Sequence, residues 1–149
     1  EKIKFLLIGG GELEDAARTM ASSNCIFAGR KGYGEMPYYL AACDAGVAPF
    51  GRLPKHLKGV GFYWSPMKIF EYLAMGLPVI TADYKELRAI VGGAGIFYKS
   101  GDHNALASAI IRISKKRIKQ NASGAKKYSW DAQAKHLVSV LEGVLKEIA

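Results

Sequence analysis

Ser65-Pro-Met-Lys-Ile-Phe-Glu71 and the nearby Ala74-Met-Gly-Leu-Pro-Val-Ile80 decide the fold of this chain. A serine followed by a proline is typical of a helix start, because the hydroxyl can cap the helix and a proline at its first position loses no hydrogen bond. Apolar residues then recur at helical spacing over 66–75, until Gly76 and Pro78 end the pattern. The apolar run 78–82 follows at once, so the stretch predicts a helix that leads directly into a buried strand.

The same alternation of short apolar runs and helical patterns continues on both sides of this stretch. This order is typical of βα units that share a parallel sheet. We therefore predict an α/β fold: a Rossmann-like parallel sheet flanked by helices, formed by a single domain over residues 1–149, with a helical C-terminal tail. Strands are expected at 3–8, 25–28, 45–49, 78–82 and 95–98, and helices at 12–21, 35–43, 66–75 and 85–91.

The last third of the chain is expected to be helical throughout. Asp102 is placed to cap one helix and Ser129 to cap another, and 115–127 predicts a polar, basic helix or helix pair between them. The two capped helices each carry an apolar stripe, formed by Ala105, Leu106, Ala109, Ile110 and Ile113 in the first and by Leu137, Val138, Leu141, Val144 and Leu145 in the second.

The 149-residue chain carries a net charge of +8, which favours anionic partners such as nucleotide phosphates or an acidic membrane surface. It has no aromatic–basic alternation and no nucleic-acid motif, so nucleic acid is not expected as a partner. Two groups hold many of the cations, and a solvated helical face is the simpler interpretation of the second. The first group is Arg52, Lys55, Lys58 and Lys68, and the second is Lys115, Lys116, Arg117, Lys119, Lys126 and Lys127.

The sequence also bears on location and on cofactors. No apolar run approaches the roughly 20 residues that span a bilayer, and residues 1–8 lack the features of a signal peptide. Cys25 and Cys43 have no metal-type spacing and suit a reducing compartment. We therefore expect a cytoplasmic protein without a metal or other cofactor, and we leave peripheral contact with the membrane face open.

Three glycines at 9–11 end the first expected strand just before a helix, where backbone amides could approach a phosphate. The dinucleotide-binding fingerprint would need another glycine at the position of Glu14, and Glu12 and Asp15 add further negative charge. A dinucleotide site is therefore excluded. Two interpretations of Gly10 and Gly11 remain, namely a tight turn and close approach of the backbone to a bound ligand.

Lys68 falls in the first turn of the expected helix 66–75, where the helix dipole disfavours a cation by ~0.3–1 kcal/mol. An anion bound at the first amides would reverse that preference, because Lys68 and the amides would share it. Glu71 lies one turn later, so a Lys68–Glu71 ion pair is one interpretation. The other is a site for a nucleoside diphosphate, with phosphate at the helix start and ribose hydroxyls on Glu71.

Glu71 and the run Ala74-Met-Gly-Leu-Pro-Val79 resemble the nucleotide-binding motif of the retaining group 1 (family 4) glycosyltransferases of the GT-B fold. Segments 3–11, 25–29, 40–49 and 128–130 resemble other motifs of that family in the expected order, so the resemblance covers nearly the whole chain. It implies that the chain is the donor-binding C-terminal half of a two-domain enzyme that uses a nucleotide sugar such as a UDP or GDP sugar.

The resemblance also implies roles for individual residues. Lys68 and Glu71 are the implied catalytic residues, and Glu71 is expected to bind the nucleotide ribose. The base is expected near the end of the second strand and the diphosphate at the helix start. The full implied set that contacts the donor is Gly10, Gly11, Ala28, Gly29, Arg30, Ser65, Pro66, Met67, Lys68, Ile69 and Glu71.

Two departures from the family pattern stand out. Tyr63 stands where the family often has a further glutamate near the transferred sugar. The strand and helix that usually open this half, with an Arg and a Lys for the donor phosphates, do not precede the first strand, and 51–59 only mimics them. Because the family's acceptor site lies on a preceding N-terminal domain, we expect this chain alone to bind donor weakly without turnover.

Other interpretations are kept open. A sugar-nucleotide epimerase of GT-B architecture and a noncatalytic anion- or nucleotide-binding module are the alternative functions. Asp83 and Glu86 follow the strand 78–82 and could reach a ligand there, although helix capping is the expected role. The histidines, His56, His103 and His136, show no metal spacing and are expected at the surface.

Overall fold

The computed structural model describes residues 3–54, 56, 59–115 and 122–148. The chain divides into two compact units, Glu1–Ala42 and Cys43–Ala149. All strand pairs in the described residues are parallel, and helices accompany the strands in both units. The predicted α/β class, with Rossmann-like parallel pairing and a helical C-terminal tail, is therefore confirmed, whereas the single-domain organisation stays a prediction.

The first unit contains a two-stranded parallel sheet. Strand β1 pairs with β2 in a register that opposes Phe5 to Cys25. Both strands lie where the apolar runs predicted them, and the first helix begins two residues later than expected. The elements are β1 (Phe5–Ile8), α1 (Glu14–Met20), β2 (Cys25–Gly29), a short 3-10 helix (Tyr33–Glu35) and α2 (Met36–Ala41).

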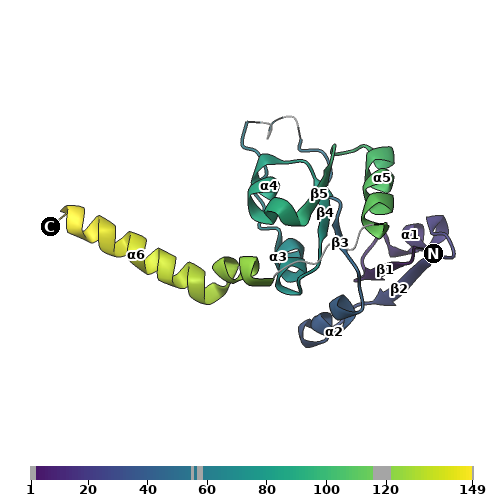
Figure 1. The fold of residues 1–149 in the computed structure, drawn as a ribbon, viewed down its shortest axis with the longest axis horizontal. Helices are drawn as coiled ribbons and strands as arrows, with labels where there is room; N and C mark the ends of the chain where they lie inside the picture. The colour runs from purple at the N-terminus through teal and green to yellow at the C-terminus, as the bar shows by residue number, and fades with distance from the viewer. Residues whose placement is uncertain (1–2, 55, 57–58, 116–121, 149) are drawn as a thin grey trace. The chain divides into compact units, whose positions relative to one another are not determined.

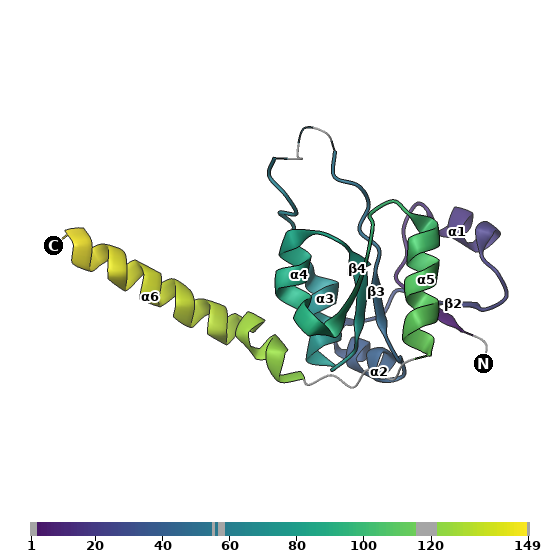
Figure 2. The same ribbon diagram turned by 45° about the horizontal axis from the view of Figure 1, so that its top comes forward.

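The second unit contains a three-stranded parallel sheet in the order β3-β4-β5. Figures 1 and 2 show α3 and α4 on one face of this sheet and α5 on the other. The elements are β3 (Gly46–Ala48), α3 (Met67–Ala74), β4 (Val79–Ala82), α4 (Lys85–Val91), a 3-10 turn (Gly92–Ala94), β5 (Gly95–Tyr98), α5 (His103–Ser114), a 3-10 helix (Ala122–Tyr128) and α6 (Trp130–Ile148).

The core of the second unit forms around β4, all four residues of which are buried. Val79 contributes to the cluster on the side of α3 and α4, whereas Ile80 contributes to the cluster on the side of α5. Thr81 satisfies its buried hydroxyl by donating to the carbonyl of Ala48 at 3.0 Å. A strand that is apolar on both faces must be covered on both faces, which is why the unit forms three layers.

Helix α5 begins and packs as its sequence predicts. The Asp102 carboxylate accepts a hydrogen bond from the amide of Ala105 at 2.9 Å, so the expected cap is confirmed. Ala109 is buried against β4 and β5, and the rest of the predicted stripe packs there partly buried. The expected cap at Ser129 is also confirmed, since its hydroxyl accepts from the amide of Ala132 at 3.2 Å.

Helix α6 differs from α5 because none of its described residues is buried. Its predicted stripe is exposed, from Val144 at 47% to Leu145 at 66%. Hydrophobic side chains repeat along one side of this helix without a covering partner among the described residues. The pattern that predicted an amphipathic helix was correct, but it did not indicate whether the stripe is buried within this chain.

A bulky tyrosine in α3 fits against a glycine in β3. The Tyr72 ring lies so close to Gly46 that a Cβ atom added there would stand 2.2 Å from the ring. The Tyr72 hydroxyl donates to the carbonyl of Val47 at 3.4 Å, and burial, with a smaller contribution from the charge of Glu71, raises the pKa of this tyrosine. Only a glycine at 46 leaves room for this ring.

We predict that Gly46→Ala lowers the free energy of unfolding by about 1–3 kcal/mol, because the added methyl group overpacks against Tyr72. Chemical denaturation of the full chain measures this change. Gly59→Ala is the matched control, since nothing lies within 4 Å of the Cβ atom that it would add. In a Tyr72→Ala background most of the cost of Gly46→Ala should disappear, and an unchanged cost would contradict the contact.

Candidate functional site

Helix α3 begins one residue later than its sequence predicts. Pro66 has ψ of 65°, outside the helical region, and is the residue that precedes the first helical residue, Met67. Ser65 then lies one position farther out, and the helix has no side-chain cap. The exposed Ser65 hydroxyl donates instead to the sulfur of Met67 at 3.6 Å. The predicted serine cap and the predicted first position for Pro66 are therefore wrong.

This shifted start decides which backbone amides of α3 are available. The Met67 amide donates to the carbonyl of Ser65 at 3.0 Å, and the Ile69 amide donates to that of Pro66 at 2.8 Å. For the Lys68 amide, the described residues provide no backbone acceptor. Among the described residues, the Lys68 amide is thus a free donor at the positive end of α3, and the side chain of the same residue carries the ammonium group.

The predicted core face of α3 is largely confirmed. Ile69 is fully buried and Leu73 nearly so, and the Phe70 ring stacks on Tyr128 with 4.8 Å between centroids. Ala74, expected on the same face, is exposed. Because the Ile69 side chain is buried and its amide is engaged, its place among the ligand contacts stays a prediction that rests on its position in the motif.

Lys68 and Glu71 do not form the ion pair that their spacing allows. In the described part of the chain, no ion pair within 4.0 Å involves either residue. The exposed Lys68 ammonium lies 5.6 Å from the centroid of the Phe50 ring instead. Glu71 is half-buried on the same helix, one turn later. The cation and the carboxylate both remain available to a ligand at the start of α3.

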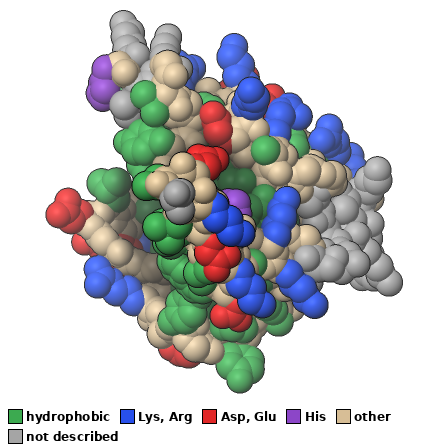
Figure 3. Space-filling model, turned by 90° about the vertical axis from the view of Figure 1, so that its left-hand side faces the viewer, with side chains coloured by type: hydrophobic (Ala, Val, Ile, Leu, Met, Phe, Trp, Pro, Cys, Tyr) green, Lys and Arg blue, Asp and Glu red, His purple; other side chains and the backbone are tan. Residues whose placement is uncertain are grey.

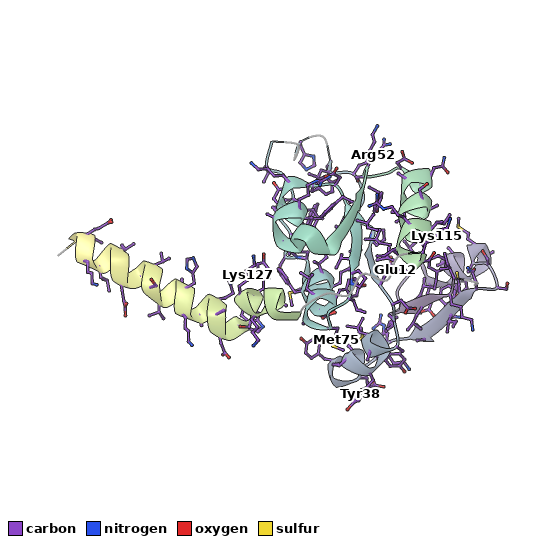
Figure 4. The ribbon with its side chains drawn as sticks, viewed as in Figure 1. Glu12, Tyr38, Arg52, Met75, Lys115 and Lys127 are labelled. Carbon is purple, nitrogen blue, oxygen red and sulfur yellow. The ribbon has the colours of Figure 1, made fainter. Side chains whose placement is uncertain are left out.

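A hydrogen-bond network fixes the segment that leaves β3 to the segment that leaves β5. The Tyr84 hydroxyl donates to the carbonyl of Gly51 at 2.7 Å and lies 3.0 Å from the Ser100 oxygen, which in turn donates to the carbonyl of Phe50 at 3.3 Å. Arg52 also folds back here, with its Nε 3.4 Å from the Ser100 carbonyl (Figure 4). These contacts hold the start of the long loop at the carboxyl edge of the sheet.

Two acidic residues at this edge are engaged locally and cap no helix. Asp83 pairs with the guanidinium of Arg88, and the hydrogen bond from Arg88 lowers the pKa of that carboxyl. Glu86 lies against the backbone of Gly61, where an added Cβ atom would stand 2.3 Å from its carboxylate. The helix α4 that follows has no side-chain cap. The expected capping role of both acids is therefore wrong.

The predicted residues of the first unit lie at the ends of its two strands. The Gly9 amide donates to the carbonyl of Gly29 at 2.9 Å, which places the glycine turn beside the end of β2. Gly10 lies between Glu14 and Arg30, since an added Cβ atom would stand 2.7 Å from the carboxylate and 3.5 Å from the arginine side chain. Gly11 has open space around it, and Ala28 is half-buried in β2.

Charged side chains are mixed on the surface. In the view of Figure 3, acidic side chains lie among the basic ones. Lys115, Lys126 and Lys127 are exposed, as a solvated face would require. Lys55, Lys58, Lys116, Arg117 and Lys119 lie outside the described residues. Within the described residues there is no cluster of three His, Cys, Asp or Glu that could hold a metal ion.

Comparison with protein families shows the family of this chain. Residues 1–116 match the model of the group 1 glycosyl transferases. The chain belongs to this family. No curated protein sequence matches the chain. The resemblance of the motifs is thus confirmed at the level of the family. In the described part of this glycosyl transferase chain, no helix is long and apolar enough to cross a membrane.

Sequence reasoning missed the Tyr84–Ser100 network of this glycosyl transferase chain. Tyr84 and Ser100 each follow a strand of the same parallel sheet, and the carboxyl ends of such strands meet at one edge. That rule could have placed the two residues near each other. It could not have shown that their hydroxyls engage the backbone at Phe50 and Gly51, because those contacts depend on the path of a loop without regular structure.

We predict that Tyr84→Phe loosens the start of the loop, because the Gly51 carbonyl loses its donor. A hydrogen bond of about 1 kcal/mol corresponds to about fivefold more local opening, so trypsin should cleave after Arg52 about five times faster under native conditions. Tyr128→Phe is the control, since the Tyr128 hydroxyl has no hydrogen-bond partner in the described part of the chain. Equal cleavage of wild type and Tyr84→Phe would contradict the role of this network.

Proposed function

We propose that this protein transfers a glycosyl group, with retention of configuration, from a UDP or GDP sugar and that the start of α3 binds the donor diphosphate. The observation that carries the proposal is the state of Lys68. Its ammonium has no acidic partner in the described residues, and its amide has no backbone acceptor there. A cation at the positive end of a helix is unfavourable by itself and becomes favourable when an anion binds.

The same site suits the chemistry of sugar transfer. As the bond between sugar and diphosphate breaks, negative charge builds up on the leaving phosphate oxygen. In this proposal Lys68 and the dipole of α3 stabilise that charge, and preorganised charge of this kind is usually the largest single contribution to enzyme catalysis. We propose that these groups, rather than a metal ion, neutralise the leaving diphosphate.

Glu71 supplies the second contact in this proposal. Its carboxylate is half-buried and has no ion pair in the described residues, so it can accept hydrogen bonds from two adjacent ribose hydroxyls. Hydrogen bonds to a charged acceptor contribute about 1.5–3 kcal/mol each, more than neutral ones. Ser65 and Met67, both exposed beside Lys68, are further proposed contacts, and the buried Pro66 and Ile69 are proposed from their positions in the motif.

The first unit is proposed to hold the base. Gly29 and Arg30 end and follow β2, and the neighbouring turn exposes the backbone of Gly10 and Gly11. The glycines leave the backbone free of side chains, and the half-buried Ala28 provides an apolar neighbour for a base. This part of the proposal rests on the family resemblance of the motifs in the first unit.

We also propose that an N-terminal domain supplies the acceptor site and that this chain without it binds donor weakly and does not turn over. The uncovered stripe of α6, which includes Leu137 and Leu141, supports a further partner surface. We also propose a cytoplasmic location, and the net charge of +8 supports peripheral contact with an anionic membrane face. Measurable sugar transfer by the isolated chain would overturn the first of these proposals.

We predict that Glu71→Ala weakens binding of UDP or GDP about tenfold or more, because charge-assisted hydrogen bonds to ribose are lost. Lys68→Ala should weaken binding of the diphosphate by a similar factor and leave binding of the corresponding nucleoside nearly unaffected. Isothermal titration calorimetry on the full chain measures both. Glu142→Ala and Lys135→Ala, which remove exposed charges of the same kinds from α6, are the matched controls.

Three results would count against this site. Equal affinities of wild type and Glu71→Ala would remove Glu71 from the ribose contact. A loss of nucleoside binding in Lys68→Ala, equal to the loss of diphosphate binding, would show that Lys68 does not act on phosphate. Binding to a DNA duplex without any binding of nucleotides would overturn the proposed function as a whole.

A further inference from the structure

Tyr63 and Trp64 form an exposed aromatic pair just ahead of α3. Their rings stack with 4.3 Å between centroids and 25° between planes. Although they cover each other on one side, Tyr63 remains 54% exposed and Trp64 44% exposed. Two large rings therefore present apolar surface to solvent side by side.

This pair is mounted on the core of the second unit. The Trp64 ring meets the buried Phe62 ring edge-on, with 5.2 Å between centroids. Phe62 in turn packs against Phe50 at 4.7 Å and Tyr84 at 5.6 Å. The Tyr84 ring thus packs against Phe62, while the Tyr84 hydroxyl donates to the Gly51 carbonyl at the start of the loop. An aromatic surface fixed in this way loses little further freedom when a ligand binds.

The position of the pair relates it to the proposed diphosphate site. Trp64 precedes Met67, the first residue of α3, by three positions, which limits their separation to about 10–11 Å. The Lys68 ammonium lies over Phe50, a ring that packs directly on Phe62. The cation and the aromatic pair therefore flank the same short stretch of chain.

The segment that carries the pair supplies no acidic side chain of its own. Residues 45–70 contain no Asp and no Glu. A sugar held here could not be bound by carboxylates of this segment, which is a common way to hold sugar hydroxyls. It could be held through the C–H groups of one ring face, which carry partial positive charge from neighbouring oxygens and are attracted to the negative face of an aromatic ring.

We propose that Tyr63 and Trp64 form a stacking platform for the pyranose ring of the donor sugar. This inference rests on the proposed function and names the part of the protein that holds the transferred sugar. A diphosphate on Lys68 carries its sugar as a direct substituent, so the ring falls within a few ångströms of the phosphate. The exposed aromatic pair, a few residues ahead of Lys68, offers apolar ring faces to that sugar.

The first test uses the intrinsic fluorescence of the full chain. The protein has two tryptophans, so Trp130→Phe leaves Trp64 as the sole reporter. We expect a sugar nucleotide to lower the quenching of Trp64 fluorescence by acrylamide to about one-half, whereas UDP or GDP alone leaves the quenching nearly unchanged. The sugar nucleotides to be tried are UDP-glucose, UDP-galactose, UDP-N-acetylglucosamine and GDP-mannose. If no sugar nucleotide protects Trp64 more than its nucleoside diphosphate does, the platform is overturned.

The second test measures affinities by calorimetry. Tyr63→Ala and Trp64→Ala should weaken binding of the sugar nucleotide about fivefold, because the contact with the sugar is lost. The affinity for the matching nucleoside diphosphate should stay within about twofold of the wild-type value. Tyr63→Phe keeps the ring and should bind as the wild type does. Trp130→Ala, which truncates a ring exposed by 84% on α6, is the control.

Other outcomes separate this inference from the function on which it rests. Equal weakening of diphosphate and sugar nucleotide would place the pair on the nucleotide and overturn the sugar platform. Protection of Trp64 by vesicles that contain anionic lipid, without protection by sugar nucleotides, would assign the pair to a membrane and overturn it too. Absence of any nucleotide binding by wild type would defeat the proposed function and the platform together, whereas nucleotide binding that is insensitive to the sugar would defeat the platform alone.

Discussion

Strand β4 is buried on both faces, and this burial determines where the functional groups of the second unit lie. Val79 and Ile80 require helices on opposite sides of the sheet, so α3 and α4 must lie against one side and α5 against the other. Since each helix runs back from the carboxyl edge of the parallel sheet, its N-terminus lies at that edge. The free amide and the ammonium of Lys68 are therefore brought to an edge that the loops after β3 and β5 also share.

The chain that approaches α3 is fixed by contacts remote in sequence. Phe62 is anchored in the core, and Tyr84 joins it from the segment after β4. The hydroxyl of the same Tyr84 holds Gly51. One side chain thus constrains both ends of the described part of the loop. A rigid approach to α3 explains how a segment without regular structure can present Trp64 and Lys68 in defined positions.

Much of this architecture could be predicted from the sequence because it depends on local pattern. Apolar runs bounded by glycine or proline marked the strands, and Asp102 lay at the right distance from its helix to cap it. The same rule predicted a cap at Ser65, and this prediction was wrong because the conformation of Pro66 moves the helix start by one residue. The predicted capping role of Asp83 was wrong because its carboxylate pairs instead with Arg88, one turn into α4. Spacing alone could not show that Lys68 forms no ion pair with Glu71, because the Lys68 ammonium lies over the ring of Phe50, which comes from another segment.

Two bulky side chains of the second unit are each matched by another residue. The Tyr72 ring occupies the space that Gly46 in the neighbouring strand leaves open. Tyr63 stands where the resemblance leads one to expect a glutamate, and Trp64 stacks on it while Phe62 supports Trp64 from the core. Because these contacts hold the two rings in fixed positions, they favour the proposed contact between the aromatic pair and the sugar of the donor.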